Sequence, residues 1–188
     1  MPAFQPIQTP RLILRPFKES DLEPFHAYRS DPEIEKYQGW GEYTLEHAQK
    51  FIDAEIKSSP GDDGESAQIA IELKESGEMI GDLHLHIPED EPDQAVLGYS
   101  IATEHQGHGY ASEALTALLD YVFGTLNKRR VTAGADAENA TSIALMERVG
   151  MRKEAHFIQS EWFREKYADE VRYAILKSEW RNRSLPSP

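Results

Sequence analysis

The 188-residue sequence contains no cysteine, which excludes disulfide bridges, thiolate metal sites and a cysteine nucleophile. It also lacks any apolar run long enough to cross a membrane, and its first residues do not combine a basic segment with an apolar one. These absences are typical of a protein from a reducing compartment. We therefore expect a cytoplasmic location and no membrane partner.

Basic residues are also scarce: 20 lysines and arginines stand against 33 aspartates and glutamates, giving a net charge of −13. A nucleic-acid phosphate backbone would repel such a chain, so we expect no direct nucleic-acid partner. The acidic excess favours a cationic partner, although acidic surfaces also serve solubility alone. The length suits a single domain over residues 1–188, with a frayed polar tail at 181–188.

Hydrophobic periodicity and turn residues divide the chain into helices and strands. The expected strands are 11–16, 67–73, 79–87, 95–102, 130–135, 152–163 and 170–176, and the expected helices are 20–28, 44–58, 111–123 and 139–149. The consecutive strands in the middle of the chain suggest an antiparallel meander. We predict an α/β (α+β) fold with a mixed, mostly antiparallel sheet of about six to seven strands, flanked by about four helices.

The stretch 106–111, Gln-Gly-His-Gly-Tyr-Ala, lies between an expected strand and the clearest expected helix. A small-residue loop there leaves backbone N–H groups unpaired, which predicts an anion site, most naturally for phosphate. A dinucleotide fingerprint would need a glycine where Ser112 stands, and a mononucleotide loop would need Gly-Lys-Ser/Thr, so neither pattern fits. Taken alone, the loop fits a plain tight turn at least as well as an anion site.

The same loop resembles the acyl-CoA signature of the GCN5-related N-acetyltransferases (GNAT), Gln/Arg-x-x-Gly-x-Gly/Ala, with Gln106, Gly109 and Ala111 in the defined positions. Likeness to the branch that acetylates ribosomal-protein N-termini at alanine or serine extends through residues 9–16, 97–101, 107–114 and 139–151. The resemblance implies the acyl-CoA N-acyltransferase fold. It also implies an N-acetyltransferase that uses acetyl-CoA as cosubstrate and no metal.

The resemblance further implies which residues bind acetyl-CoA. In the family, a bulged and splayed strand before the glycine loop offers N–H groups to the acyl end of the cosubstrate, and Gly98 is compatible with such a bulge. The loop amides would hold the pyrophosphate. The expected cofactor-binding residues are Tyr99, Ser100, Ile101, Ala102, Gln106, Gly107, His108, Gly109, Tyr110, Ala111, Ser112, Asn139 and Ser142.

Acetyl transfer needs a neutral amine, a stabilised oxyanion and a protonated thiolate leaving group. The resemblance implies that Ser142 protonates the thiolate; the alternative is a first-turn polar residue behind the helix cap Asn139. Glu161 matches the place of a glutamate proposed as general base in ribosomal-protein acetyltransferases, and a solvated strand glutamate is an equal alternative. Without a cysteine, we expect direct transfer within a ternary complex.

The acceptor side has four candidate substrate-binding residues. His84 and His86 share one strand face that could line a cleft, and no third ligand is spaced for a metal. Trp40 lies on a connection that flanks the acceptor in the family, and Trp162 is a similar candidate. We expect an amine acceptor, first a protein or peptide N-terminal α-amine, then a small-molecule amine, amino sugar or antibiotic. A catalytically silent acyl-CoA-binding sensor is an alternative of another class, and the chain is expected to be a monomer or homodimer.

Overall fold

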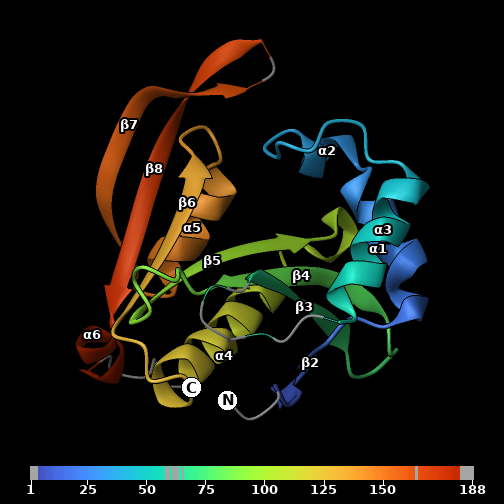
Figure 1. Ribbon diagram of the computed structural model, residues 1–188, viewed down its shortest axis with the longest axis horizontal. Helices are drawn as coiled ribbons and strands as arrows, with labels where there is room; N and C mark the ends of the chain where they lie inside the picture. The colour runs from blue at the N-terminus through green and yellow to red at the C-terminus, as the bar shows by residue number, and fades with distance from the viewer. Residues whose placement is uncertain (1–3, 58–59, 61–63, 65, 164, 183–188) are drawn as a thin grey trace.

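The computed structural model describes residues 4–57, 60, 64, 66–163 and 165–182 (Figure 1). In this part of the chain the strands are β1 Ile7–Gln8, β2 Leu12–Arg15, β3 Ser66–Leu73, β4 Met79–His86, β5 Gln94–Ile101, β6 Arg130–Asp136, β7 Arg152–Phe163 and β8 Lys166–Leu176. The α-helices are α1 Leu22–Arg29, α2 Pro32–Glu35, α3 Leu45–Glu55, α4 Tyr110–Gly124, α5 Ala140–Arg148 and α6 Lys177–Asn182. Short 3-10 turns at Glu19–Asp21 and Thr103–His105 precede α1 and α4.

All described strands join one sheet in the order β1-β2-β3-β4-β5-β6-β8-β7. Each neighbouring pair is antiparallel except β5 and β6, so the mixed, mostly antiparallel fold is confirmed. The sheet has eight strands rather than six or seven, because the two-residue β1 also pairs with β2. The short helices α2 and α6 add to the expected four. Arg181 and Asn182 belong to α6 rather than to a frayed tail, and the remaining tail, 183–188, lies outside the described residues.

Helices cover the two faces of the sheet unequally. On β3, Ile69 and Ile71 pack into the core under α4, whereas Ala70 between them packs with α1 and α3, because successive strand residues point to opposite faces. The buried stripe of α4 is the one its periodicity predicts: Ala114, Leu115, Leu118, Leu119, Val122 and Phe123. Burying each of its larger side chains contributes roughly 1.5–3 kcal/mol, so α4 fixes the position of the loop that precedes it.

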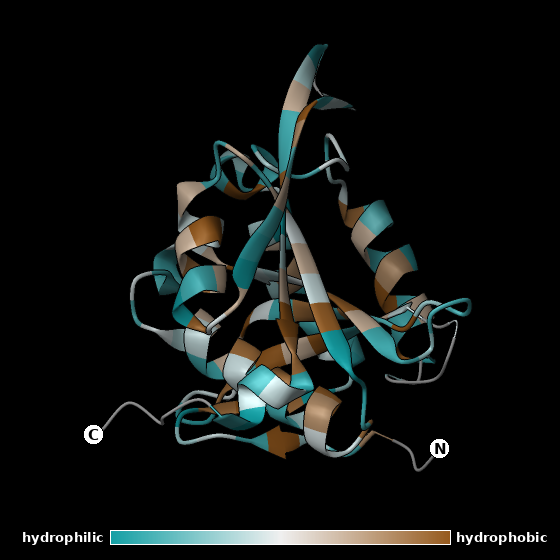
Figure 2. Ribbon diagram, turned by 90° about the vertical axis from the view of Figure 1, so that its left-hand side faces the viewer, coloured by the Kyte–Doolittle hydropathy of each residue, from teal (hydrophilic) through white to brown (hydrophobic). Residues whose placement is uncertain are grey.

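The opposite face remains partly open. There α1 and α3 form a small aromatic core with Phe25 and Ile52 over β3 and β4. The β7–β8 hairpin extends beyond the remainder of the sheet and rises above the other elements (Figures 1 and 2). Within the described residues, no helix combines the length and apolar character that a bilayer crossing requires.

Candidate active site

The strands β5 and β6 separate after a short parallel contact. They pair only at Gln94–Arg130, Ala95–Val131 and Val96–Thr132. Beyond Val96, β5 continues alongside β4 and β6 alongside β8, which opens a split in the middle of the sheet. The register of β5 on β4 is unbroken from Val96 to Ile101, so the strand has no bulge at Gly98, the position compatible with the bulge that the resemblance implies. The glycine instead accommodates a cross-strand neighbour, since a Cβ there would stand 3.2 Å from the Cβ of His84.

The glycine loop connects this split to α4. Gly107 and Gly109 adopt φ angles of +78° and +81°, in the left-handed region that glycine tolerates best. The Gln106 side chain donates to the Ile101 carbonyl at 2.9 Å and so anchors the loop to the end of β5. The N–H of Glu113 bonds to the Gly109 carbonyl at 3.1 Å, and the N–H groups of residues 107–112 have no acceptor among the described residues. These groups form an anion site at a helix N-terminus.

Arg11 fixes the start of α4 and places a positive charge beside the loop. Its Nε donates to Glu113 at 2.7 Å, its Nη1 donates to the His108 carbonyl at 2.9 Å, and the Thr9 hydroxyl donates to Glu113 at 2.6 Å. Burial tends to raise the pKa of Glu113, but these hydrogen bonds and the Arg11 charge outweigh burial and lower it below 4.5. The guanidinium of Arg11 also lies 4.5 Å from the centroid of the Tyr110 ring.

The other predicted loop residues gather at the same place. The His108 ring stacks on Tyr110 with centroids 5.8 Å apart, and the Ser112 hydroxyl accepts from Arg148 at 3.3 Å. Ala102 follows β5 directly and is buried, and its N–H donates to the Ile80 carbonyl at 2.8 Å. The structure therefore brings the predicted cofactor-binding residues between 99 and 112 together along β5 and the start of α4.

The first turn of α5 faces the split from the other side. The Asn139 side chain caps α5 by accepting from the Ser142 N–H at 3.1 Å. The Tyr99 hydroxyl lies 2.8 Å from the Ser142 Oγ and donates to the Ser142 carbonyl at 3.1 Å. Burial raises the pKa of Tyr99 to about 12, although the hydrogen bond with Ser142 opposes the shift. Tyr99 therefore stays protonated near neutral pH and forms a hydroxyl pair with Ser142.

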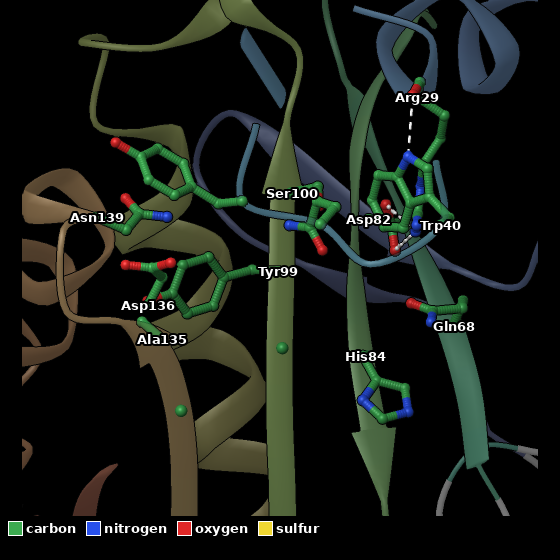
Figure 3. A pocket seen from close by; sticks show the side chains of 14 residues that line it. Arg29, Trp40, Gln68, Asp82, His84, Tyr99, Ser100, Ala135, Asp136 and Asn139 are labelled. Carbon is green, nitrogen blue, oxygen red and sulfur yellow. Dashed lines mark hydrogen bonds and ion pairs between the residues drawn. The ribbon is translucent and has the colours of Figure 1, made fainter. Parts of the chain in front are cut away.

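A cavity of about 390 Å³ lies between the split and the α1 side of the sheet. Its wall includes Arg29, Tyr37, Gln38, Trp40, Gln68, Asp82, His84, Gly98, Tyr99, Ser100, Gly134, Ala135, Asp136 and Asn139. In Figure 3 the Tyr99 ring reaches from β5 toward Asp136 and Asn139, while Asp82, His84 and Trp40 lie on the other side of β5. The cavity thus joins the predicted acyl end of the cosubstrate to the predicted acceptor side.

A buried charge pair supports the α1 side of this cavity. Arg29 donates to the two oxygens of Asp82 at 3.1 and 3.0 Å, and the Tyr28 hydroxyl donates to the same carboxylate. Burial alone would lower the pKa of Arg29, but the charge of Asp82 outweighs it and raises this pKa. Trp40 stacks on the guanidinium at 4.1 Å and donates to the Arg29 carbonyl at 3.2 Å. These contacts hold Trp40 in place as part of the cavity wall.

The two predicted histidines differ in position. His84 lines the cavity, and its Nε2 lies 2.6 Å from the Ser66 hydroxyl. Burial lowers the pKa of His84 below 6.5; the Asp82 charge opposes this effect, while His86 and Arg29 add to it. His86 stacks on His84 with centroids 6.5 Å apart but is not part of the cavity wall.

The residues predicted on β7 lie outside the cavity wall. Glu161 is exposed and faces Ala168 across the hairpin. Trp162 is 65% exposed and packs edge-on against Tyr167, with centroids 5.0 Å apart. The structure does not bring either residue to the cavity, and their roles stay predictions.

Sequence reasoning missed several wall residues, namely Arg29, Gln68, Asp82 and Asp136. Asp82 carried a usable signal, because it is a lone carboxylate in the apolar run 79–87 and needs a buried partner. The partner itself, Arg29, lies 53 residues earlier and carries no such signal.

The described side chains that could together hold a metal ion lie away from this cavity. Among the described residues, the set of potential ligands that approach within 4.8 Å of one another is Glu78, Glu104 and His105. Both glutamates are exposed, and none of the three residues lines the cavity. Exposed carboxylates of this kind are common without an ion.

Comparison with known proteins identifies this architecture. Residues 11–152 match the model of an acetyltransferase (GNAT) domain. An acetyltransferase of the GNAT family from Bacillus anthracis has a similar structure, with a TM-score of 0.84, 29% identity, and coverage of 93% of this chain and 99% of that one. Spermidine N-acetyltransferase from Vibrio cholerae, in complex with CoA and spermine, has a TM-score of 0.76 and 25% identity, with 93% and 100% covered. RimL, a ribosomal L7/L12 alpha-N-protein acetyltransferase in complex with coenzyme A, shares the fold at a TM-score of 0.79 and 23% identity, with 92% and 98% covered. The resemblance found in the sequence is confirmed.

Proposed function

Because the chain belongs to the GNAT family and is an N-acetyltransferase, we propose that it transfers acetyl from acetyl-CoA to the N-terminal α-amine of a peptide or protein. One observation carries the proposal: the anion-binding loop, the split between β5 and β6, and the 390 Å³ cavity all meet along β5. A phosphate-bearing arm at one end and an amine at the other can therefore approach each other through the split.

The fit to acetyl-CoA is supported by the groups that the chain leaves unpaired. The N–H groups of residues 107–112 suit a pyrophosphate, and Arg11 supplies positive charge beside them. The diverging edges of β5 and β6 offer N–H and C=O groups to the amides of the pantetheine arm. In this proposal Gln106 holds the loop in place rather than binding the cosubstrate directly.

We assign the proton donor of the reaction to Ser142. When the amine nitrogen attacks the thioester carbon and the C–S bond breaks, the departing sulfur needs a proton. The hydroxyl of Ser142 can donate this proton to the sulfur. The hydroxyl of Tyr99, 2.8 Å away, can then return a proton to Ser142. The raised pKa of Tyr99 keeps that second proton in place at neutral pH.

The shape of the acceptor side favours a peptide. A second cavity, of about 650 Å³, shares Gly134 with the first and continues along the same face of β5 and β6. Its charged residues include ion pairs, Arg130 with Glu154 and Arg172 with Glu170. The wall holds three carboxylates, including Glu91, against two guanidiniums, so its ion pairs cancel most of its charge. Such a wall suits the polar backbone of an extended peptide better than a ligand with several positive charges.

A polyamine is the second candidate acceptor. The net charge of −13 attracts polycations, Asp136 lines the first cavity, and the similar Vibrio cholerae protein is a spermidine N-acetyltransferase. Asp82, the other carboxylate in the wall, is neutralised by Arg29. One uncompensated carboxylate favours a single ammonium group over several.

A CoA-release assay distinguishes these acceptors. Since the chain has no cysteine, a thiol-reactive chromophore reports only the CoA that the reaction releases. The panel contains a peptide beginning with serine or alanine, the same peptide with its N-terminus acetylated, and spermidine. We expect turnover with the free peptide and none with the blocked one. Faster turnover with spermidine would overturn the peptide assignment, and no release with any amine would overturn the proposed transfer.

A further inference from the structure

His84 lines the 390 Å³ cavity beside Gly98, where β5 carries no side chain. It pairs with Gly98 on the neighbouring strand, and a Cβ at Gly98 would lie 3.7 Å from the Nδ1 of His84. Nδ1 is therefore the ring nitrogen next to the open position of the missing side chain. Both residues line the cavity, so an amine in the cavity can reach this nitrogen.

The other ring nitrogen already has a partner. Nε2 of His84 lies 2.6 Å from the hydroxyl of Ser66, on the strand that flanks β4 on its other side. If Nε2 carries the hydrogen and donates to Ser66, the lone pair of a neutral imidazole resides on Nδ1. A proton accepted there produces an imidazolium whose Nε2–H remains bonded to Ser66.

Several charged groups surround this imidazole. Asp82 and His86 lie on the same strand, Arg29 approaches from α1, and Asp136 lines the cavity from β6. Burial is the largest influence on His84 and lowers its pKa, while the Asp82 charge opposes that shift. The imidazole is therefore mostly neutral at pH 7, which a proton acceptor requires.

We propose that His84 is the general base that removes a proton from the acceptor ammonium group, with Ser66 and Gly98 as positioning residues. This inference rests on the proposed acetyl transfer. It differs from the prediction for Glu161, whose exposed position on β7 lies outside the cavity wall.

The proton balance of the reaction closes with this role. The ammonium nitrogen gives a proton to Nδ1 of His84, and its freed lone pair forms the C–N bond to the thioester carbon. The C–S bond then breaks, and the sulfur takes a proton from Ser142, which recovers one from the former amine nitrogen through solvent or Tyr99. One hydrogen stays on the amide nitrogen, one ends on CoA, and one leaves to solvent from His84.

The first test needs no knowledge of the acceptor. In protein labelled with ¹⁵N-histidine, two-bond ¹H–¹⁵N spectra at pH 7.5 report which nitrogen carries the hydrogen, and the signals lost in His84→Gln identify His84. We expect the Nε2–H form with an unprotonated Nδ1. A hydrogen on Nδ1 would overturn the proposal.

The second test compares pH profiles of acetyl transfer. The wild-type kcat should level off above the pKa of His84. In His84→Gln, kcat at pH 7.5 should fall about 10²-fold and keep rising with pH as the amine deprotonates by itself. Imidazole should restore part of the activity of His84→Ala, and the Kd for CoA should not change. The matched control is His26→Gln on α1, outside the cavity wall, which should keep the wild-type profile.

Two further variants sharpen the outcome. Gly98→Ala places a Cβ 3.2 Å from the Cβ of His84, so kcat should fall while CoA affinity stays constant. Glu161→Gln separates the two candidate bases, because a kcat that keeps rising with pH in this variant would assign the base to Glu161. If the wild type is active and His84→Gln retains both its rate and its pH profile, the role of His84 alone is overturned. Loss of the pH plateau of kcat in Glu161→Gln overturns it as well. No CoA release by the wild type with any amine overturns the proposed function as well.

Discussion

Replacing Asp82 by asparagine should destabilise the fold strongly. Asp82 is 2% exposed and Arg29 6% exposed, and the guanidinium donates to Asp82 at 3.1 and 3.0 Å. Asparagine keeps the size of the side chain but leaves Arg29 buried without a counter-charge, which costs about 3–5 kcal/mol. In a protein of this length each kcal/mol corresponds to a change in Tm of about 2–4 °C, so the Tm should fall by roughly 6–20 °C.

Thermal unfolding followed by circular dichroism, with urea unfolding at 25 °C, measures this cost. The matched control is the double variant Asp82→Asn with Arg29→Met, which removes the unpaired charge and leaves an unbranched side chain beside Trp40 and Phe25. The double variant leaves no unpaired buried charge, so it should be more stable than Asp82→Asn alone. A loss below about 1 kcal/mol in the single variant, or a double variant no more stable, would refute the reasoning.

Other predictions concern the proton donor and the start of α4. Ser142→Ala should lower kcat by about 10²-fold, with the calorimetric Kd for CoA unchanged, and full turnover would contradict its role. Tyr99→Phe should reduce kcat less, because Ser142 keeps its own proton. The folded-state pKa of Glu113 lies below 4.5, so its stabilisation is present above the unfolded-state pKa and is lost as pH falls through the folded one. The urea midpoint of the wild type should therefore fall more steeply below pH 4.5 than that of Glu113→Gln. Equal dependence of the two midpoints on pH would count against the ion pair between Arg11 and Glu113.

The elements that the sequence predicts well are those whose signals are local. The apolar stripe of α4 recurs at helical spacing, and the glycine loop is recognisable because it separates a strand from that helix. The Asn139 cap and the Ser142 N–H lie three residues apart, so both could be assigned to one helix start. Such features depend on neighbours in the sequence, and the structure confirms the elements that carry them.

The features that sequence reasoning missed depend on distant partners. Tyr99 and Ser142 are 43 residues apart, and Arg29 and Asp82 are 53 residues apart, so no local sequence pattern predicts either pair. Gly98 is compatible with a bulge in the sequence, because a glycine in a strand does not reveal which side chain stands opposite it. Likewise β8 begins at Lys166 rather than 170, because its first residues pair with the end of β7.

The split between β5 and β6 links the stability of the folded protein to the ligand that fills it. A sheet that opens in its middle leaves hydrogen-bonding edges where other sheets are closed, and diverging edges cannot both accept one straight strand from another chain. A substrate arm that bonds to both edges ties the halves together and stabilises the folded state by about 2.7 kcal/mol at a hundredfold excess over its Kd. Under the proposed function that arm belongs to acetyl-CoA, so the free energy of unfolding should rise with the acetyl-CoA concentration.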